Sequence, residues 1–426
     1  MIKIMDYSKT SNEEIFYRGM AASGVEDIVA EIISDVRKNK DAALFKYCKK
    51  FDNTDTDKLE VTQEEIDEAF ASVDPHFIEV IKKARENIYN YHKHQVKNSF
   101  IISENDGVVL GQKVTPLKRA GIYVPGGTAA YPSTVLMNIV PAKIAGVDEI
   151  VMTSPAKDGK INPIILAAAK IAGADRIFKV GGAQAVAALA YGTETIPKVD
   201  KIVGPGNAFV AEAKKQVFGL VDIDMIAGPS EILVISDGNS DCKTVAADML
   251  SQAEHDKLAS AVLVTDSRNL AEGVAAEIER QLKLLPREEI ARTSIEANGK
   301  IIITENINQA IEIANEIAPE HLEIVTKNPF EVMTKIKNAG AIFLGEYSSE
   351  PLGDYFAGPN HTLPTSGTAK FSSPLSVDDF VKKSAFTYYT KEALSKVCDD
   401  IAYFAEKEGL SGHARSALVR FDKAGI

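Results

Sequence analysis

The chain has no tryptophan and few cysteines, and the cysteines that it has are poorly placed for pairing. Cys48, Cys242 and Cys398 are odd in number and far apart, with no Cys-x-x-Cys pair among them. This pattern favours neither a disulfide framework nor a zinc site made of thiolates. Any metal ion bound by this chain would therefore need nitrogen and oxygen ligands.

Long apolar runs and blocks of like charge are missing as well. No stretch approaches the roughly 18 consecutive apolar residues of a membrane-spanning helix, and the first six residues lack the basic and apolar segments of a signal peptide. There are 48 Lys and Arg residues against 60 Asp and Glu residues, which gives a net charge of −12. We therefore expect a soluble cytoplasmic protein that binds neither nucleic acid nor anionic membranes.

The length of 426 residues and the 45% hydrophobic content predict two large domains or about three smaller ones. The first hundred residues are mostly helical by periodicity, chiefly over 25–51 and 63–92. Ser11 and Glu14 have the spacing of a capping box at the start of a helix. These helices are expected to form a scaffold or a dimer arm.

From about Lys118, short β-branched runs alternate with helical segments. Strands are expected at 121–124, 149–152, 176–180, 201–203, 261–264, 300–303 and 341–344, with helices at 243–255, 270–284 and 307–317. This alternation predicts an α/β protein with two parallel, doubly wound halves. After Gly353 the chain is rich in loop-forming residues, and it is expected to finish in helices from Ser376 and Lys391.

Three glycine turns in the first half lie where strands should end. They are Pro125-Gly-Gly127, Gly181-Gly-Ala-Gln184 and Gly204-Pro-Gly-Asn207. Ligands of open α/β sheets bind at the carboxyl ends of strands, where helix N-termini can meet phosphate, so a dinucleotide is the natural candidate. None of the turns completes Gly-x-Gly-x-x-Gly, and no acidic ribose anchor is evident about 20 residues onward. A plain role in tight turns therefore stays open for each glycine.

Four of the seven histidines have amide or carboxylate neighbours in the sequence. The groups are Gln252 with His255, Glu320 with His321, Asp354 with Asn360 and His361, and Glu408 with His413. An imidazole beside a carboxylate can bind a divalent metal, hold one tautomer or carry a proton near neutral pH. Gln252 and His255 are about 60° apart around a helix axis, so both can face one site. The pattern indicates a single metal and proton-transfer site.

Each of these groups also has a simpler explanation. His255 can complement the dipole at a helix end, and Glu320 with His321 can be a surface pair. Asp354 and His361 lie in a segment rich in turn-forming residues, and His413 can cap a helix. The local sequence leaves these alternatives open.

Longer motifs follow one another along the chain. They are Gly121-Ile-Tyr-Val-Pro-Gly-Gly127, Val203-Gly-Pro-Gly-Asn-Ala-Phe-Val210, Ala227-Gly-Pro-Ser-Glu-Ile232, Ser251-Gln-Ala-Glu-His-Asp256, Ala318-Pro-Glu-His-Leu322, Gly353-Asp-Tyr-Phe-Ala-Gly-Pro-Asn-His-Thr-Leu-Pro-Thr365 and Glu408-Gly-Leu-Ser-Gly-His413. In this order they closely resemble the histidinol dehydrogenase family, from roughly residue 20 to the end. The order of several long motifs is far more specific than any single turn.

The resemblance implies a function and a set of site residues. It implies the last two oxidations of histidine biosynthesis, from L-histidinol through enzyme-held L-histidinaldehyde to L-histidine, with two NAD+ and one Zn2+ per site. The implied proton acceptors are Glu320 and His321. The implied zinc ligands are Gln252, His255, Asp354 and His413, and the implied NAD contacts are Tyr123, Gln184 and Asn207. The implied substrate contacts are Ser230, Gln252, His255, His321, Asp354, Glu408 and His413.

The resemblance also implies an intertwined homodimer with two incomplete Rossmann-like domains and small helical terminal segments. We expect an N-terminal helical arm at 1–24, a first Rossmann-like domain at 25–118 with 237–375, a second, NAD-side domain at 119–236 and a C-terminal helical domain at 376–426. His413 and Glu408 would reach the partner's site. The alternative is a paralogue that uses zinc and NAD to oxidise another small alcohol, and a non-catalytic nucleotide-binding protein is a more distant one.

One departure from the family pattern is Ser348-Ser-Glu350, where a proline is expected before the glutamate. It touches none of the implied site residues. All three cysteines fall in expected helices away from the motifs, so no thioester step is expected.

Overall fold

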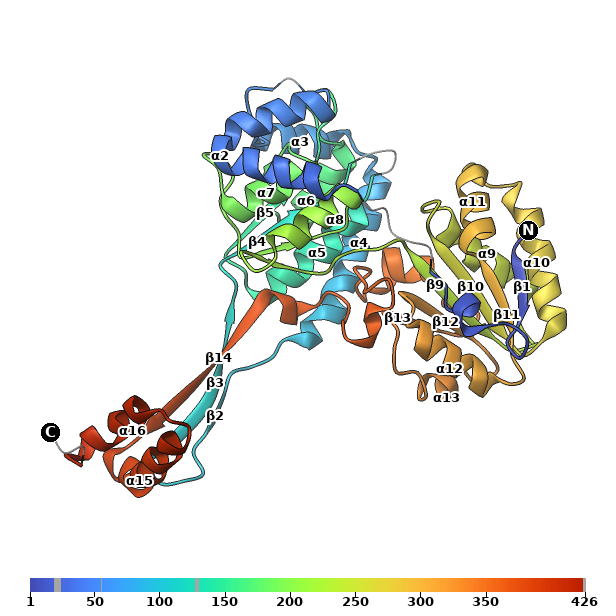
Figure 1. Cartoon of the computed structure of the whole chain (residues 1–426). Coiled ribbons are helices and arrows are strands. Elements are labelled where there is room, and N and C mark those ends of the chain that lie inside the picture. The colour runs from blue at the N-terminus through green and yellow to red at the C-terminus, as the bar shows by residue number, and fades with distance from the viewer. Residues whose placement is uncertain (19–23, 55, 127–129, 424–426) are drawn as a thin grey trace. The chain divides into compact units, whose positions relative to one another are not determined.

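The computed structural model describes residues 1–18, 24–54, 56–126 and 130–423 (Figure 1). Gly127 of the first glycine turn therefore lies outside the described residues. The chain divides into two compact units: unit 1 contains Met1–Gln95 and Leu117–Phe380, and unit 2 contains Val96–Pro116 and Val381–Ile426. In the described ranges no helix is both long and apolar enough to cross a membrane.

The first sheet of unit 1 has five parallel strands in the order β6-β5-β4-β7-β8. Its strands are β4 (Arg119–Tyr123), β5 (Glu149–Thr153), β6 (Arg176–Phe178), β7 (Lys201–Val203) and β8 (Asp222–Ile223). The prediction of parallel strands in this part of the chain is confirmed. Both faces of the sheet are covered, so the side chains of successive strand residues pack into two different hydrophobic cores. Ile122 belongs to one core and Tyr123 to the other.

Seven helices pack against this sheet or against the helices that cover it. They are α2 (Glu26–Phe51), α3 (Gln63–Ser72), α4 (Pro75–His92), α5 (Pro132–Ala145), α6 (Pro163–Ala172), α7 (Gly182–Tyr191) and α8 (Ala208–Val217). One core contains residues of α3, α4, α5 and α6, and the other contains residues of α2, α7 and α8. The alanine-rich sequence of α7 lets α2 pack closely over it (Figure 1).

This arrangement differs from the expected domain division, which groups residues 25–118 with residues 237–375. The N-terminal helices instead pack on the first sheet: α2 contacts α7 and α8, α3 contacts α6, and α4 contacts α5. The reason is burial, since the apolar faces of these helices complete the two cores of that sheet.

The second sheet of unit 1 has six parallel strands in the order β1-β11-β10-β9-β12-β13. Its strands are β1 (Lys3–Asp6), β9 (Glu231–Ser236), β10 (Ser260–Thr265), β11 (Lys300–Ile303), β12 (His321–Val325) and β13 (Ala341–Leu344). Its helices are α9 (Cys242–Ala253), α10 (Arg268–Leu282), α11 (Glu288–Asn298), α12 (Ile307–Ile317) and α13 (Pro329–Met333).

The expected N-terminal helical arm is wrong for the first residues of the chain. β1 pairs with β11 along its length and so becomes an edge strand of the second sheet. Only α1 (Asn12–Ile15) follows it before residue 19, and the Ser11 hydroxyl caps that turn by accepting a hydrogen bond from the Glu14 N–H at 3.3 Å. Ile2 and Met5 are buried, which explains why the segment is held on the sheet.

Two short helical elements follow β13 and lead into the loop-rich segment. α14 (Glu350–Leu352) continues into the π-helical turn η2 (Gly353–Ala357). Single 3-10 turns are η1 (Lys93–Gln95), η3 (Thr368–Lys370), η4 (Val377–Phe380) and, in unit 2, η5 (Val419–Phe421).

Unit 2 contains a three-stranded antiparallel sheet in the order β14-β3-β2 and two helices. The elements are β2 (Phe100–Ile102), β3 (Val108–Pro116), β14 (Val381–Tyr389), α15 (Lys391–Lys407) and α16 (Ser411–Leu418). The expected helix after Ser376 is wrong for Val381–Tyr389, because every residue of that segment pairs with β3. The helix predicted from Lys391 is confirmed.

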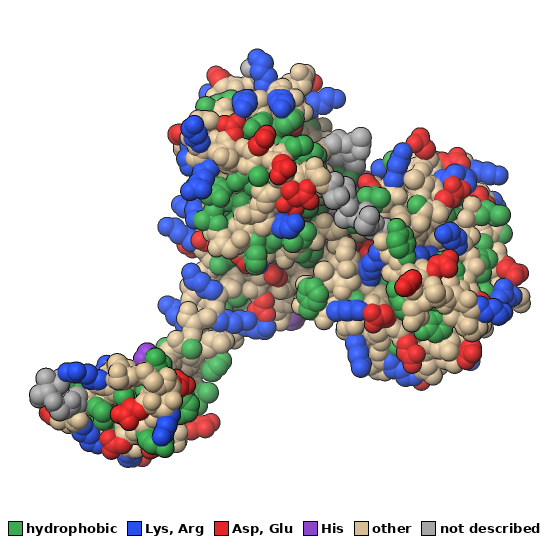
Figure 2. Space-filling model, in the orientation of Figure 1, with side chains coloured by type: hydrophobic (Ala, Val, Ile, Leu, Met, Phe, Trp, Pro, Cys, Tyr) green, Lys and Arg blue, Asp and Glu red, His purple; other side chains and the backbone are tan. Residues whose placement is uncertain are grey.

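The surface carries charges of both signs. On the described part of the face in Figure 2, Lys and Arg side chains are interspersed with Asp and Glu side chains. The net charge of −12 is therefore not gathered into one acidic patch on that face.

Candidate active site

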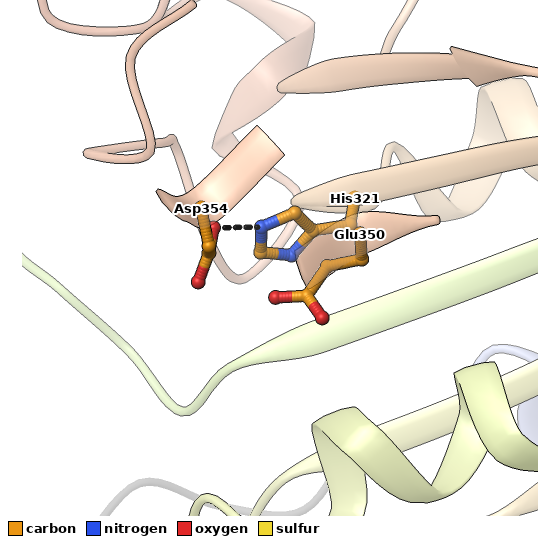
Figure 3. Close-up of side chains that lie close together, drawn as sticks. All are labelled: His321, Glu350 and Asp354. Carbon is orange, nitrogen blue, oxygen red and sulfur yellow. Dashed lines mark ion pairs between the residues drawn. The ribbon is translucent and has the colours of Figure 1, made fainter. Parts of the chain in front are cut away.

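His321 is the centre of a buried polar group at the amino end of β12. The strand lies between β9 and β13, and the His321 side chain is buried. Nδ1 of His321 is 3.0 Å from the carbonyl oxygen of Glu231, which can only accept a hydrogen bond. Nδ1 therefore carries a proton, and Nε2 is the atom that faces the Asp354 Oδ1, at 3.6 Å (Figure 3).

Two carboxylates determine the charge of this imidazole. Glu320 Oε2 is 3.6 Å from Nδ1 of His321, on the side opposite Asp354. Burial acts to lower the pKa of His321, but Glu320 and Asp354 outweigh it and raise the pKa to about 10. Burial likewise acts to raise the pKa of Asp354, and its bond with His321 brings that pKa down to about 2. In the protein alone, His321 and Asp354 thus form an ion pair.

Glu320 has the properties of a general base near neutral pH. It is buried, and its Oε2 accepts a hydrogen bond from the backbone N–H of Glu231 at 2.9 Å. Burial raises its pKa to about 7, although the charge of His321 opposes the shift. A base with a pKa near the working pH is the most effective kind for proton transfer.

Glu350 joins this group and was not found by sequence reasoning. One ligand atom from each of His321, Glu350 and Asp354 lies within 4.8 Å of the others, so the three can hold a metal ion (Figure 3). Burial, followed by the charge of Asp354, raises the pKa of Glu350 to about 8. The only available signal was the departure from the family pattern, because Ser349 directly precedes this residue.

Gln252 lies in the last turn of α9, and His255 lies in the turn that follows, because the helix ends at Ala253 and not at the expected residue 255. Gln252 is buried, and its Oε1 has no hydrogen-bond partner among the described residues. His255 is exposed, yet desolvation by the surrounding protein lowers the pKa of its imidazole, and the Asp354 carboxylate opposes that shift. His255 is therefore within electrostatic reach of Asp354, as a shared site requires.

His361 contacts the backbone of Asp354. Its Nδ1 is 3.1 Å from the backbone carbonyl of Asp354, and its Nε2 is 3.5 Å from the Thr134 hydroxyl of α5. The adjacent Asn360 donates a hydrogen bond to the backbone carbonyl of Met137 at 2.7 Å. Asp354 is thus more than a turn former, because its segment is tied to α5 while its side chain faces His321.

A cavity of about 580 Å³ opens beside the group. His321, Asp354 and His361 contribute polar atoms to its wall, and Phe343 and Leu363 are among its apolar lining residues. A volume of this size admits a small organic molecule. Ser230, a predicted substrate contact, is half-buried directly before β9, and its carbonyl accepts a hydrogen bond from the Ser260 N–H at 2.9 Å.

The predicted NAD contacts Tyr123 and Gln184 meet at the carboxyl edge of the first sheet. Tyr123 ends β4, and its hydroxyl accepts a hydrogen bond from the Gly182 N–H at 3.1 Å. Gln184 is buried in the first turn of α7, and its side chain folds against Gly182. Burial raises the pKa of Tyr123 to about 12, so its phenol stays neutral.

The turn that carries Asn207 packs against the backbone of Tyr123. Gly204 has φ +118°, and a Cβ there would collide with the Tyr123 carbonyl, so only glycine fits. Asn207 caps α8, because its Oδ1 accepts hydrogen bonds from the N–H groups of Phe209 and Val210 at 3.1 and 3.2 Å.

A buried ion pair that the sequence did not reveal holds this turn. Lys214 Nζ donates to the Gly204 carbonyl at 3.0 Å, and the Gly204 N–H donates to Asp224 Oδ2 at 2.8 Å. Lys214 and Asp224 also pair with each other, and both side chains are almost fully buried. Both polar groups of the Gly204 backbone are thereby fixed.

Glu408 and His413 belong to unit 2. Glu408 ends α15, His413 lies in the first turn of α16, and both side chains are exposed. The group around His321 is built from unit 1 alone.

Comparisons with known proteins identify the family of this chain. The model of the histidinol dehydrogenase family matches residues 18–421. Histidinol dehydrogenase of Clostridium acetobutylicum is 57% identical over 427 residues, which cover 99% of each chain. That of Listeria monocytogenes serovar 1/2a is 57% identical over 399 residues, 94% of this chain and 93% of the other.

A solved structure gives the same result at the level of the fold. The crystal structure of histidinol dehydrogenase from Elizabethkingia anophelis superposes with a TM-score of 0.94 at 38% identity, over 100% of this chain and 99% of that chain. The agreement covers the whole length of both proteins. The chain therefore belongs to the histidinol dehydrogenase family and is an oxidoreductase.

Proposed function

We propose that this chain oxidises L-histidinol through L-histidinaldehyde to L-histidine, using Zn2+ and two molecules of NAD+. The observation that carries the proposal is the buried group of His321, Glu320 and Asp354 beside a cavity of about 580 Å³. Two successive oxidations need a group that accepts the alcohol proton and a base that activates water. The names of the relatives supply the substrate.

The residues fit a zinc ion. Gln252 offers a buried carbonyl oxygen without a partner in the described chain, Asp354 is ionised, and the lowered pKa of His255 favours the neutral imidazole that a metal needs. Together with His413 of the partner subunit these residues would be the ligands. When bound, zinc supplies a fixed positive charge that orients the nitrogen atoms of the substrate.

Glu350 would hold Asp354 rather than bind the metal. With a pKa of about 8, Glu350 is mostly protonated at neutral pH and donates a hydrogen bond to Asp354. A protonated carboxyl is a poor ligand. The protonated Glu350 carboxyl would keep one Asp354 oxygen in place, and the other Asp354 oxygen would stay available to the metal.

His321 would accept the hydroxyl proton of L-histidinol in the first oxidation. Its Nδ1 is held by the Glu231 carbonyl, so the proton arrives at Nε2. Asp354 would stabilise the imidazolium less if it served as a metal ligand. The pKa of His321, about 10 in the protein alone, would then fall toward the range in which the imidazole can accept a proton.

Glu320 would activate the water that attacks the aldehyde in the second oxidation. Its pKa of about 7 suits a base that works near neutral pH. The mechanism uses no thiol. Cys48 and Cys398 are buried inside helices, and burial raises the pKa of Cys48 to about 12. Cys242 is half-buried at the start of α9, where its Sγ lies against Gly273 of α10. The substrate contacts would be Ser230, Gln252, His255, His321 and Asp354 of one protomer, with Glu408 and His413 of its partner.

NAD+ would bind at the carboxyl edge of the first sheet. The amino ends of α7 and α8 lie there with Tyr123, Gln184 and Asn207. Because Asn207 Oδ1 already caps α8, its Nδ2 would contact the cofactor.

We further propose that each sheet with its helices is an incomplete Rossmann-like domain, and that the protein is an intertwined cytoplasmic homodimer. The exposure of Glu408 and His413 on unit 2 supports a site completed between protomers. Such a site would use the same two residues twice, once in each half of the dimer.

Removal of the metal is expected to abolish turnover. Dialysis against a chelator should stop NADH formation from L-histidinol, and Zn2+ should restore it. Gln252→Leu should weaken zinc binding at least about ten-fold, measured as bound zinc per chain. Gln63→Leu, at an exposed position of α3, should bind zinc like the unchanged protein. Full turnover by zinc-free protein would contradict the proposed metal site.

A further inference from the structure

The C-terminal end of α2 lies beside the carboxyl ends of two strands of the first sheet. The Thr54 hydroxyl donates to the Ala156 carbonyl at 2.8 Å, shortly after β5 ends at Thr153. Cys48 Sγ is 3.5 Å from the Lys179 carbonyl, directly after β6. The segment 52–54 is therefore fixed at the edge where the glycine turns lie.

The hydrogen bonds that hold this segment among the described residues do not use Oδ2 of the Asp52 carboxyl. The helix end is capped by the backbone, because the Asp52 N–H donates to the Cys48 carbonyl at 3.0 Å. Asp52 Oδ2 is buried, yet it has no hydrogen-bond partner in the described part of the chain. Buried polar atoms without partners are rare and costly, so an ordered ligand or water is expected at this oxygen.

Dinucleotide sites in folds of this kind need an acidic residue for the ribose. In such folds the strand next to the glycine-turn strand carries an acidic residue that binds the ribose hydroxyls. Here β4 leads into the turn at Gly126, and its neighbour β5 ends in Thr153-Ser154-Pro155 without a carboxylate. The expected residue is thus missing from its usual place.

Close packing brings the strand ends and Asp52 into one region. A Cβ at Gly126 or at Gly181 would collide with Pro155, so the loops after β4, β5 and β6 touch one another. The Asp52 carboxylate is near enough to Tyr123 to help raise the pKa of its phenol. Burial raises the pKa of Asp52 itself to about 6, which leaves it mostly ionised at neutral pH.

We propose that Asp52 accepts hydrogen bonds from the ribose hydroxyls of NAD+ and thereby favours NAD+ over NADP+. The inference rests on the proposed function, since it assumes that NAD+ binds at this edge of the first sheet. A carboxylate matches two hydroxyl donors, whereas it repels the 2′-phosphate of NADP+. Asp52 reaches the ribose site from a helix that precedes the sheet in sequence.

The test compares Asp52→Asn with the unchanged zinc-loaded protein by calorimetric titration with NAD+, NADP+ and L-histidinol. We expect NAD+ binding to weaken about 10- to 100-fold, because a hydrogen bond to a charged group is lost. NADP+ should bind at least as tightly as before, and the affinity for L-histidinol should be unchanged. Asp35→Asn is the matched control, since Asp35 lies on the same helix and pairs with Lys46 at 2.7 Å.

The outcomes separate this inference from the proposed function. If the unchanged protein fails to bind NAD+, the proposed function itself is wrong. If it binds NAD+ and Asp52→Asn binds equally well, Asp52 does not contact the ribose. Equal weakening of NAD+ and NADP+ binding, or of L-histidinol binding, would mean a structural role and would also overturn the inference. A second variant, Asp52→Ser, should show the same loss of preference for NAD+, with thermal unfolding as the check on folding.

Discussion

Replacing Glu320 with glutamine is expected to slow oxidation of L-histidinaldehyde about 10²- to 10⁴-fold, the usual contribution of a general base. Glutamine has nearly the same shape and can still accept the hydrogen bond from the Glu231 N–H. What it loses is the ability to take a proton from water. Oxidation of L-histidinol to the aldehyde should slow far less, because His321 accepts the proton in that step.

The two half-reactions can be measured separately. Single-turnover NADH formation would be followed once from L-histidinol and once from supplied L-histidinaldehyde. Glu231→Gln is the matched control, because Glu231 is buried beside Glu320 and its carboxyl pairs with Arg18 at 2.7 Å. That variant should leave the ratio of the two rates unchanged. Equal losses in both half-reactions of Glu320→Gln would contradict the division of labour between Glu320 and His321.

Mixing two inactive variants is expected to restore activity. His255→Ala and His413→Ala should each be almost inactive, since each removes a proposed zinc ligand from every site. In a mixed dimer, one site receives His255 from one protomer and His413 from the other, so it is unmutated. Random exchange should then give about a quarter of the original activity, because half of the dimers are mixed and each has one working site of two.

Subunit exchange has to be verified in the same experiment. Two differently tagged protein preparations would be mixed, and dimers that carry both tags would be isolated before assay. A mixture of one variant with itself is the control and should stay inactive. Tagged mixed dimers without activity would refute a site shared between protomers.

The sequence predicted those parts of the fold that local patterns encode. The short apolar runs predicted as strands at 121–124 and 261–264 lie in the parallel strands Arg119–Tyr123 and Ser260–Thr265, whose sheets are covered on both faces. β14 was missed because its pairing with β3 joins distant parts of the chain. Nothing local to Val381–Tyr389 reveals a partner so far away, and most of its side chains are exposed.

The site was predictable where motifs carry chemistry. Glu320, His321 and Asp354 were selected from sequence, and they are neighbours in the structure. Glu350 and Asp52 were not, because a lone acidic residue is usually a solvated surface group. Only the folded chain shows that Glu350 is buried beside Asp354 and that Asp52 Oδ2 is buried without a hydrogen-bond partner among the described residues. The packing of α2 on the first sheet, which places Asp52, is equally invisible to periodicity.

The most direct test of the proposed function is the number of NADH molecules formed per L-histidinol consumed. Zinc-loaded protein would be given a limiting amount of L-histidinol and excess NAD+, and NADH would be measured at completion. The proposed four-electron oxidation predicts a ratio near two, with L-histidine as the product. A ratio near one would mean that the aldehyde is released, and no turnover would mean that L-histidinol is not the substrate; either result would contradict the proposal.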